Sequence, residues 1–97
     1  MSSFVARVPT RSASRYMQQL AKHWSHKMTV AFDAEEAVIE FPNGSRLAMR
    51  ADPDTLDCVL TVPNDGEPER MRGVVEEHLN RFAFREGALT FEWRGGG

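Results

Sequence analysis

The sequence predicts a two-layer α+β domain, in which two helices pack on one face of an antiparallel sheet. Two segments carry apolar residues at helical spacing, and the four segments between them alternate apolar and polar residues with a period of two. Short turns separate the alternating segments, so neighbouring strands are expected to run antiparallel. A length of 97 residues suits a single core, and we expect residues 1–97 to form one domain.

The N-terminal third is predicted to contain a strand and a helix. Residues 4–8 alternate weakly, as in a short strand that Pro9 ends. Thr10 or Ser12 is suited to cap the helix that follows. The apolar positions of this helix form one stripe over three turns, namely Ala13, Tyr16, Met17, Leu20, Ala21 and Trp24.

Four strands are predicted next, over residues 28–32, 37–41, 46–50 and 55–62. Asn43-Gly44, between the second and third of them, is a strong hairpin signal. The inner face of the whole sheet is expected to hold Met28, Val30, Phe32, Ile39, Phe41, Leu47, Met49, Leu56, Cys58, Leu60, Leu89, Phe91 and Trp93.

The second helix is predicted to begin near Pro68, which suits a first helical turn. Its stripe comprises Met71, Val74, Val75, His78, Leu79 and Phe82. Gly87 is expected to take the left-handed conformation after the helix, and residues 88–93 to form the last strand. The order β-α-β-β-β-β-α-β is that of TATA-binding-protein-like folds, an analogy that implies no function.

The outer face of the sheet is expected to be mixed, with a small apolar centre formed by Ala31, Val38, Ala48 and Val59. Such a centre suits a second copy of the chain or a ligand, and symmetric pairs are the commonest assemblies. We therefore expect a homodimer. The alternative is a solvated sheet face.

Charge is distributed unevenly along the chain. Five basic residues and no acidic residue precede Asp33, whereas fourteen acidic and seven basic residues follow from there, for a net charge of −2. The basic segment is either a solvated helix face or a patch for an anionic ligand. No nucleic-acid motif and no apolar run of membrane-spanning length occurs, so neither partner is expected. The single cysteine, Cys58, fits a soluble protein of the reducing cytoplasm.

The histidines offer the most specific candidate site. His78 lies on the second helix's apolar stripe and His23 borders that of the first, so the two rings are expected to approach across the helix–helix groove. Arg81 and Arg85 are expected near the rim of this groove, and Lys27 at the edge of the first helix's stripe if the helix extends that far. Three interpretations stay open: a structural polar network, a site for a carboxylate or phosphate, and a transition-metal site formed by His23, His26 and His78.

Three motifs support a family resemblance. They are residues 14–20 (SRYMQQL), residues 22–27 (KHWSHK) and residues 78–86 (HLNRFAFRE), with Trp93 near the C-terminus. Through them the chain resembles the bacterial family designated domain of unknown function 2218. The resemblance implies a small bacterial protein without established activity. It also implies a setting in iron acquisition, because similar domains occur near siderophore-interacting reductases.

The primary hypothesis is therefore a non-catalytic binding or accessory module with no cofactor, whose ligand is a small anion or a siderophore-like molecule. The alternative is a small metal-binding protein, or a cofactor-free acid–base enzyme that uses His23 and His78. No catalytic motif of known specificity supports an enzyme, and no catalytic residue is assigned.

Overall fold

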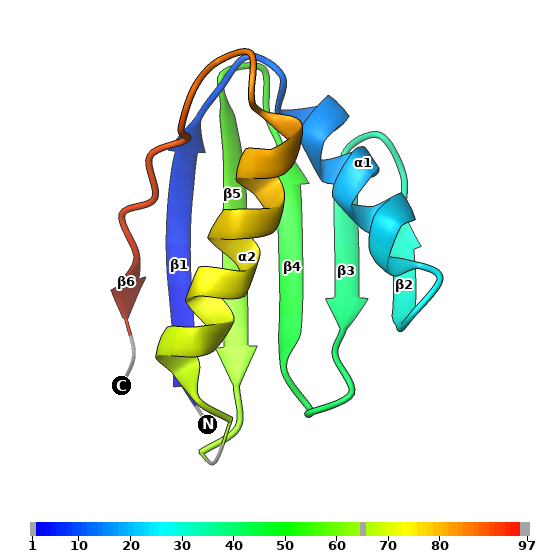
Figure 1. Cartoon of the computed structure of the whole chain (residues 1–97), viewed down its shortest axis with the longest axis vertical. Helices are drawn as coiled ribbons and strands as arrows, with labels where there is room; N and C mark the ends of the chain where they lie inside the picture. The colour runs from blue at the N-terminus through cyan, green and yellow to red at the C-terminus, as the bar shows by residue number, and fades with distance from the viewer. Residues whose placement is uncertain (1, 65, 96–97) are drawn as a thin grey trace.

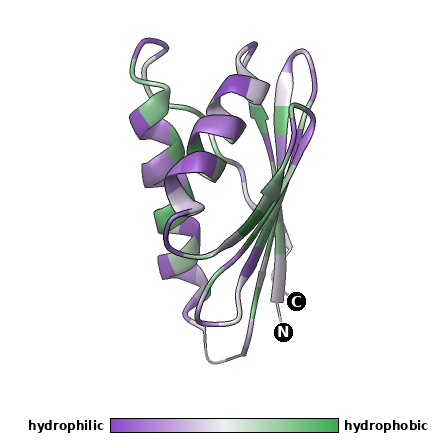
Figure 2. Cartoon of the chain, turned by 90° about the vertical axis from the view of Figure 1, so that its right-hand side faces the viewer, coloured by the Kyte–Doolittle hydropathy of each residue, from purple (hydrophilic) through white to green (hydrophobic). Residues whose placement is uncertain are grey.

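A computed structural model describes residues 2–64 and 66–95 (Figure 1). Its elements are β1 (Ser2–Pro9), α1 (Ala13–Trp24), β2 (Thr29–Phe32), β3 (Glu36–Glu40), β4 (Arg46–Ala51), β5 (Thr55–Val62), α2 (Pro68–Phe82) and β6 (Arg94–Gly95). The strands form one antiparallel sheet in the order β2-β3-β4-β5-β1-β6. Both helices pack on the same face, as the side view in Figure 2 shows. The predicted α+β fold class and order of elements are confirmed.

Helix α1 buries the whole predicted stripe, from Ala13 to Trp24, against the sheet. Its start differs from the prediction, because neither Thr10 nor Ser12 caps the helix with its side chain. Instead, the Thr10 hydroxyl accepts a hydrogen bond from the Ser12 N–H (3.1 Å) and donates to the Glu86 carboxylate (2.9 Å). Thr10 thus ties the segment before α1 to the segment after α2.

Helix α2 presents two rows of side chains to the rest of the domain. Met71, Val75 and Leu79 are buried over the sheet. Val74, His78 and Phe82 form the next row, which is half-buried and lies on the side of α1. The two helices converge where α1 begins and α2 ends, and they diverge toward the opposite ends (Figure 1). No helix within residues 2–64 and 66–95 is long and apolar enough to cross a bilayer.

The C-terminal segment departs from the prediction. Residues 88–93 form no strand, and β6 consists of Arg94–Gly95 alone, paired with Phe4 and Val5 of β1. The reason is that side chains of α2 hold this segment. The Asn80 amide oxygen accepts the Leu89 N–H (2.7 Å), and the Trp93 indole N–H donates to Glu76 (2.9 Å).

Most of the predicted inner face packs against the core, and Phe32 is the exception. Phe32 lies at the end of the edge strand β2 and is 37% exposed. Ala37, its partner on β3, is buried instead. Gly87 has a φ of +83°, so the predicted left-handed conformation after α2 is confirmed.

The outer face of the sheet carries residues in rows that run across the strands. One row is apolar and continuous through five strands: Ala31, Val38, Ala48, Val59 and Val5. The adjacent row alternates in charge: Glu36, Arg50, Asp57 and Arg7. Val59 and Val5 are 39% and 44% exposed, so the predicted apolar centre extends to β1.

Candidate functional site

The groove between α1 and α2 brings the two predicted histidines together. The ring centroids of His23 and His78 lie 5.9 Å apart with a tilt of 41°. His78 also contacts the Trp24 ring (5.0 Å), and His23 contacts the Phe82 ring (6.2 Å). The predicted approach of these imidazoles across the groove is confirmed, because α1 and α2 pack side by side on the sheet.

A hydrogen bond to the main chain orients His78. Its Nδ1 lies 2.7 Å from the main-chain carbonyl oxygen of Val74, one turn earlier in α2. A carbonyl oxygen only accepts, so Nδ1 carries the hydrogen and donates it. In the neutral ring, Nε2 then has the free lone pair. The ring is half-buried against Trp24, which limits its access to solvent.

His23 is more exposed, and its surroundings disfavour a second positive charge. Partial desolvation lowers the pKa of His23 below its ordinary value of 6.5. Positive charge on His78, Lys27, Arg81 and His26 lowers this pKa further. These surroundings thus favour the neutral form of the His23 imidazole.

The other predicted site residues do not join the two rings in one cluster. Lys27 and His26 are exposed in the turn after α1. Arg81 forms an exposed ion pair with Glu77 (3.7 Å), and Arg85 lies beside the Phe84 ring. Within the described ranges, no group of three or more His, Cys, Asp or Glu side chains is placed to hold a metal ion. The predicted ligand set His23, His26 and His78 is thus not assembled.

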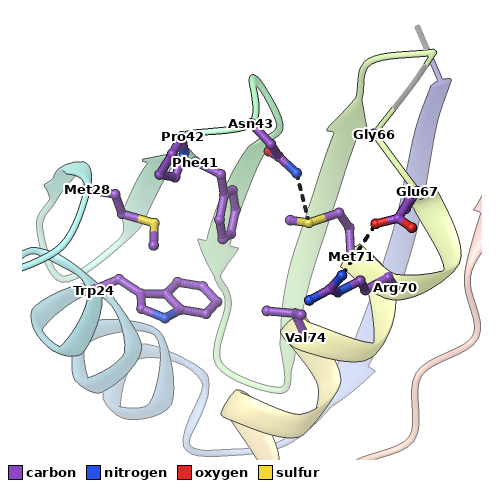
Figure 3. A pocket seen from close by; sticks show the side chains of 10 residues that line it. All are labelled: Trp24, Met28, Phe41, Pro42, Asn43, Gly66, Glu67, Arg70, Met71 and Val74. Atoms are coloured by element: carbon purple, nitrogen blue, oxygen red, sulfur yellow. Dashed lines mark hydrogen bonds and ion pairs between the residues drawn. The ribbon is translucent and has the colours of Figure 1, made fainter.

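A hollow of about 440 Å³ lies where the helices diverge, and we call it the apolar hollow (Figure 3). Its lining comprises Trp24, Met28, Phe41, Pro42, Asn43, Gly66, Glu67, Arg70, Met71 and Val74. The Trp24 and Phe41 rings meet edge to face at 5.1 Å, and Met28 and Met71 bring their thioethers to its walls. The aromatic rings and thioethers thus form a largely apolar interior.

The charged and amide groups of the apolar hollow, on Asn43, Glu67 and Arg70, lie on the side away from Trp24 and Met28 (Figure 3). The Asn43 amide donates to the Met71 sulfur (3.4 Å), and Arg70 pairs with Glu67 at 3.5 Å. Both members of this ion pair are largely exposed, so the pair is weak and the guanidinium is free to turn toward a ligand. The arrangement is an apolar interior with a few orienting polar groups, as in small-molecule sites.

Local backbone geometry builds the walls of this hollow. The Asn43 side chain accepts the Ser45 N–H (2.9 Å), and Gly44 takes a φ of +88°, which together shape the β3–β4 turn. Gly66 packs so tightly on β5 that a Cβ atom there would lie 2.7 Å from Val62. Sequence reasoning missed the hollow, because its lining residues come from three segments whose proximity no local pattern reveals.

Arg81 and Arg85 line a different cavity, of about 330 Å³, where the helices converge. The histidine pair lies between the two spaces. His78 contacts Trp24 of the apolar hollow, and His23 contacts Phe82 of the second cavity. The single predicted cluster is therefore three neighbouring features along one groove.

A family model and a solved structure are similar to this chain over nearly its whole length. Residues 5–94 match the family described as "Uncharacterized protein conserved in bacteria (DUF2218)". The NMR structure of PA4090 from Pseudomonas aeruginosa is similar, with 34% sequence identity and a TM-score of 0.79. The match covers 97% of this chain and 96% of that one. No curated protein matches the chain significantly.

Proposed function

The chain belongs to the DUF2218 family of uncharacterised bacterial proteins, and on this premise we propose that it is a non-catalytic small-molecule-binding module. The observation that carries the proposal is the apolar hollow between α1, α2 and the β3–β4 turn. Its volume of about 440 Å³ falls within the range of small-molecule sites. Neither His23 nor His78 lines it, which favours binding over acid–base chemistry.

The lining of the hollow indicates the class of ligand. Trp24, Phe41 and the two methionine sulfurs offer edges and faces suited to a flat aromatic ring. Arg70 and Asn43 stand where a hydroxyl or carboxylate on that ring would receive hydrogen bonds. A catechol-type ring, the iron-binding group of many siderophores, has this chemistry. The link to iron acquisition rests on the family's setting alone.

Tryptophan fluorescence tests this proposal directly. In a Trp93→Phe background Trp24 is the sole tryptophan, so quenching reports on the apolar hollow. We expect saturable quenching by dihydroxybenzoate, weakened about tenfold in Arg70→Gln through loss of a charge-assisted hydrogen bond. Arg46→Gln, on the outer sheet face, is the matched control and keeps the affinity. Quenching that does not saturate would refute the hollow as a site.

The second candidate function is acid–base catalysis by the histidine pair. It is favoured by one observation: His23, whose pKa is lowered by desolvation and nearby positive charge, lies beside His78, whose Nδ1 is fixed as a donor. This candidate requires both rings to reach the bound ligand. It predicts that dihydroxybenzoate shifts the imidazole NMR signals and pH titrations of both histidines, whereas the binding module leaves the titration of His23 unchanged.

For the partner, we propose a second copy of the chain, packed through the outer face of the sheet. A two-fold axis parallel to the strands, between β4 and β5, places Ala48 opposite Val59 and Val38 opposite Val5 of the other copy. The same axis places Arg50 opposite Asp57, and Glu36 opposite Arg7. The apolar and charged rows are thus self-complementary under one rotation.

The size of this face limits the area that a dimer could bury. Six strands spaced about 4.8 Å apart, which together contain 33 residues at about 3.4 Å each, offer on the order of 500 Å² per copy. The total of about 1,000 Å² is at the lower limit for specific interfaces. We therefore propose a weak dimer that forms with rising concentration.

A further inference from the structure

We propose that the cavity where α1 and α2 converge is a second ligand site, which binds a planar ring carrying a phosphate group. This basic cavity has a volume of about 330 Å³ and is lined by Ser12, Arg15, Tyr16, Gln19, Arg81, Phe82, Phe84, Arg85 and Glu86. The inference is independent of the apolar hollow, with which this cavity shares no lining residue.

The lining of this cavity carries a net positive charge. Three guanidinium groups line the cavity, from Arg15 on α1, Arg81 on α2 and Arg85 just beyond it. Glu86 is the one carboxylate in the lining, and no ion pair within 4 Å joins it to these arginines in the described ranges. The net charge of the lining is therefore +2, which suits a phosphate dianion better than a single carboxylate.

Glu86 is already occupied by neutral donors. The Thr10 hydroxyl shares its one hydrogen between the two carboxylate oxygens, at 2.9 and 3.2 Å, and the Tyr16 hydroxyl donates a second hydrogen bond to this carboxylate. These bonds anchor the carboxylate to the start of α1. Among residues 2–64 and 66–95, the one ion pair of Arg81 is its long, exposed contact with Glu77 (3.7 Å), which a phosphate would readily replace. The guanidinium groups thus remain available to an anion.

An exposed aromatic ring, that of Phe84, also lines the cavity. Phe84 is 72% exposed, the most exposed large hydrophobic side chain in the described ranges. The Arg85 guanidinium lies 5.7 Å from its ring centre. An aromatic face beside arginine is the arrangement that stacks a planar ligand while its anionic group is bound. The exposed Phe84 ring and the three arginines together therefore indicate a ligand that carries both an aromatic ring and a phosphate group, rather than a free inorganic anion.

Two further groups orient such a ligand. The Gln19 amide and the Ser12 hydroxyl also line the cavity and supply neutral donors. Ser12 immediately precedes α1, whose first turn has no capping side chain and no acidic residue. The partial positive charge of this helix end adds to that of the arginines.

Calorimetric titration with three probes tests the site: AMP, inorganic phosphate and adenosine. We expect AMP to bind at least tenfold more tightly than phosphate or adenosine. Phe84→Ser should bring the affinity for AMP close to that for phosphate and leave the affinity for phosphate unchanged. The reason is that the exposed Phe84 ring contacts only the planar base of AMP. Arg85→Gln should weaken AMP and phosphate together.

Arg46→Gln and Arg70→Gln are the matched controls, and both should bind AMP as the wild type does. Thermal melts of every variant check that the fold is kept, and the exposed positions of Phe84 and Arg85 favour this outcome. The proposal is overturned if AMP and phosphate bind equally, if Phe84→Ser retains the wild-type affinity for AMP, or if AMP does not bind. A loss of AMP binding in Arg70→Gln would place the ligand in the apolar hollow and overturn it too.

Discussion

The imidazole rings of His23 and His78 lie 5.9 Å apart across the α1–α2 groove, and they separate two spaces of different chemistry. His78 contacts Trp24, which lines the apolar hollow, and His23 contacts Phe82, which lines the basic cavity. The pair itself is packed among rings and has one anchored nitrogen, on His78. The two rings thus lie at the contact between the two helices.

The lowered pKa of His23 predicts a pH dependence of stability. Below pH 6.5 the unfolded chain takes up a proton at this residue more readily than the folded chain, so the free energy of unfolding falls as pH falls. Urea denaturation at neutral pH and near pH 5 should show a smaller loss in His23→Gln than in the wild type. Identical losses in the two proteins would contradict the role given to His23.

The thiol of Cys58 is predicted to be unreactive in the folded protein. Burial raises the pKa of its thiol to about 12, and the side chain has no exposed area. The reactive thiolate is therefore scarce and shielded, so a disulfide reagent should label Cys58 only as the protein unfolds. The labelling rate should rise with urea in step with loss of the far-UV circular dichroism signal. Rapid stoichiometric labelling in native buffer would refute the predicted protection.

The hydrogen bond between the Tyr16 hydroxyl and Glu86 should contribute to stability. Tyr16→Phe removes a donor to a carboxylate and should lower the free energy of unfolding by about 1–3 kcal/mol. A double-mutant cycle with Glu86→Ala separates this bond from other effects of the phenol. Strictly additive effects would show that the two side chains do not interact.

The proposed dimer makes a concentration-dependent prediction. Sedimentation velocity should show a shift from monomer to dimer between low and high micromolar protein. Val59→Lys should abolish the shift, because it places a charge in the apolar row. Lys22→Gln, on the helical side, should leave it unchanged. A wild-type monomer at high micromolar concentration would remove the dimer proposal and leave the outer face for another partner or solvent.

Much of the fold follows from local sequence patterns. The stripe from Ala13 to Trp24 and the alternating segment at 55–62 are each long enough to reveal their period, and both elements form where predicted. The approach of His23 and His78 was also predictable, since two striped helices on one sheet face must be neighbours.

Features that depend on long-range contacts were not predictable. Residues 88–93 alternate like a strand, yet Asn80 and Glu76 hold them with side-chain hydrogen bonds. Glu86 has no local signal for its role as an anchor of Thr10 and Tyr16. The separation of Arg81 and Arg85 from the apolar hollow depends on the angle between the helices, which neither apolar stripe encodes.

The most direct test of the binding module is NMR shift mapping with dihydroxybenzoate. We expect the largest changes at the Trp24 indole, the Met28 and Met71 methyls and the Val74 methyls, with saturation at one ligand per chain. The same titration of Arg70→Gln should show the same pattern at weaker affinity. Changes confined to residues outside the apolar hollow, or no saturable change, would contradict the account.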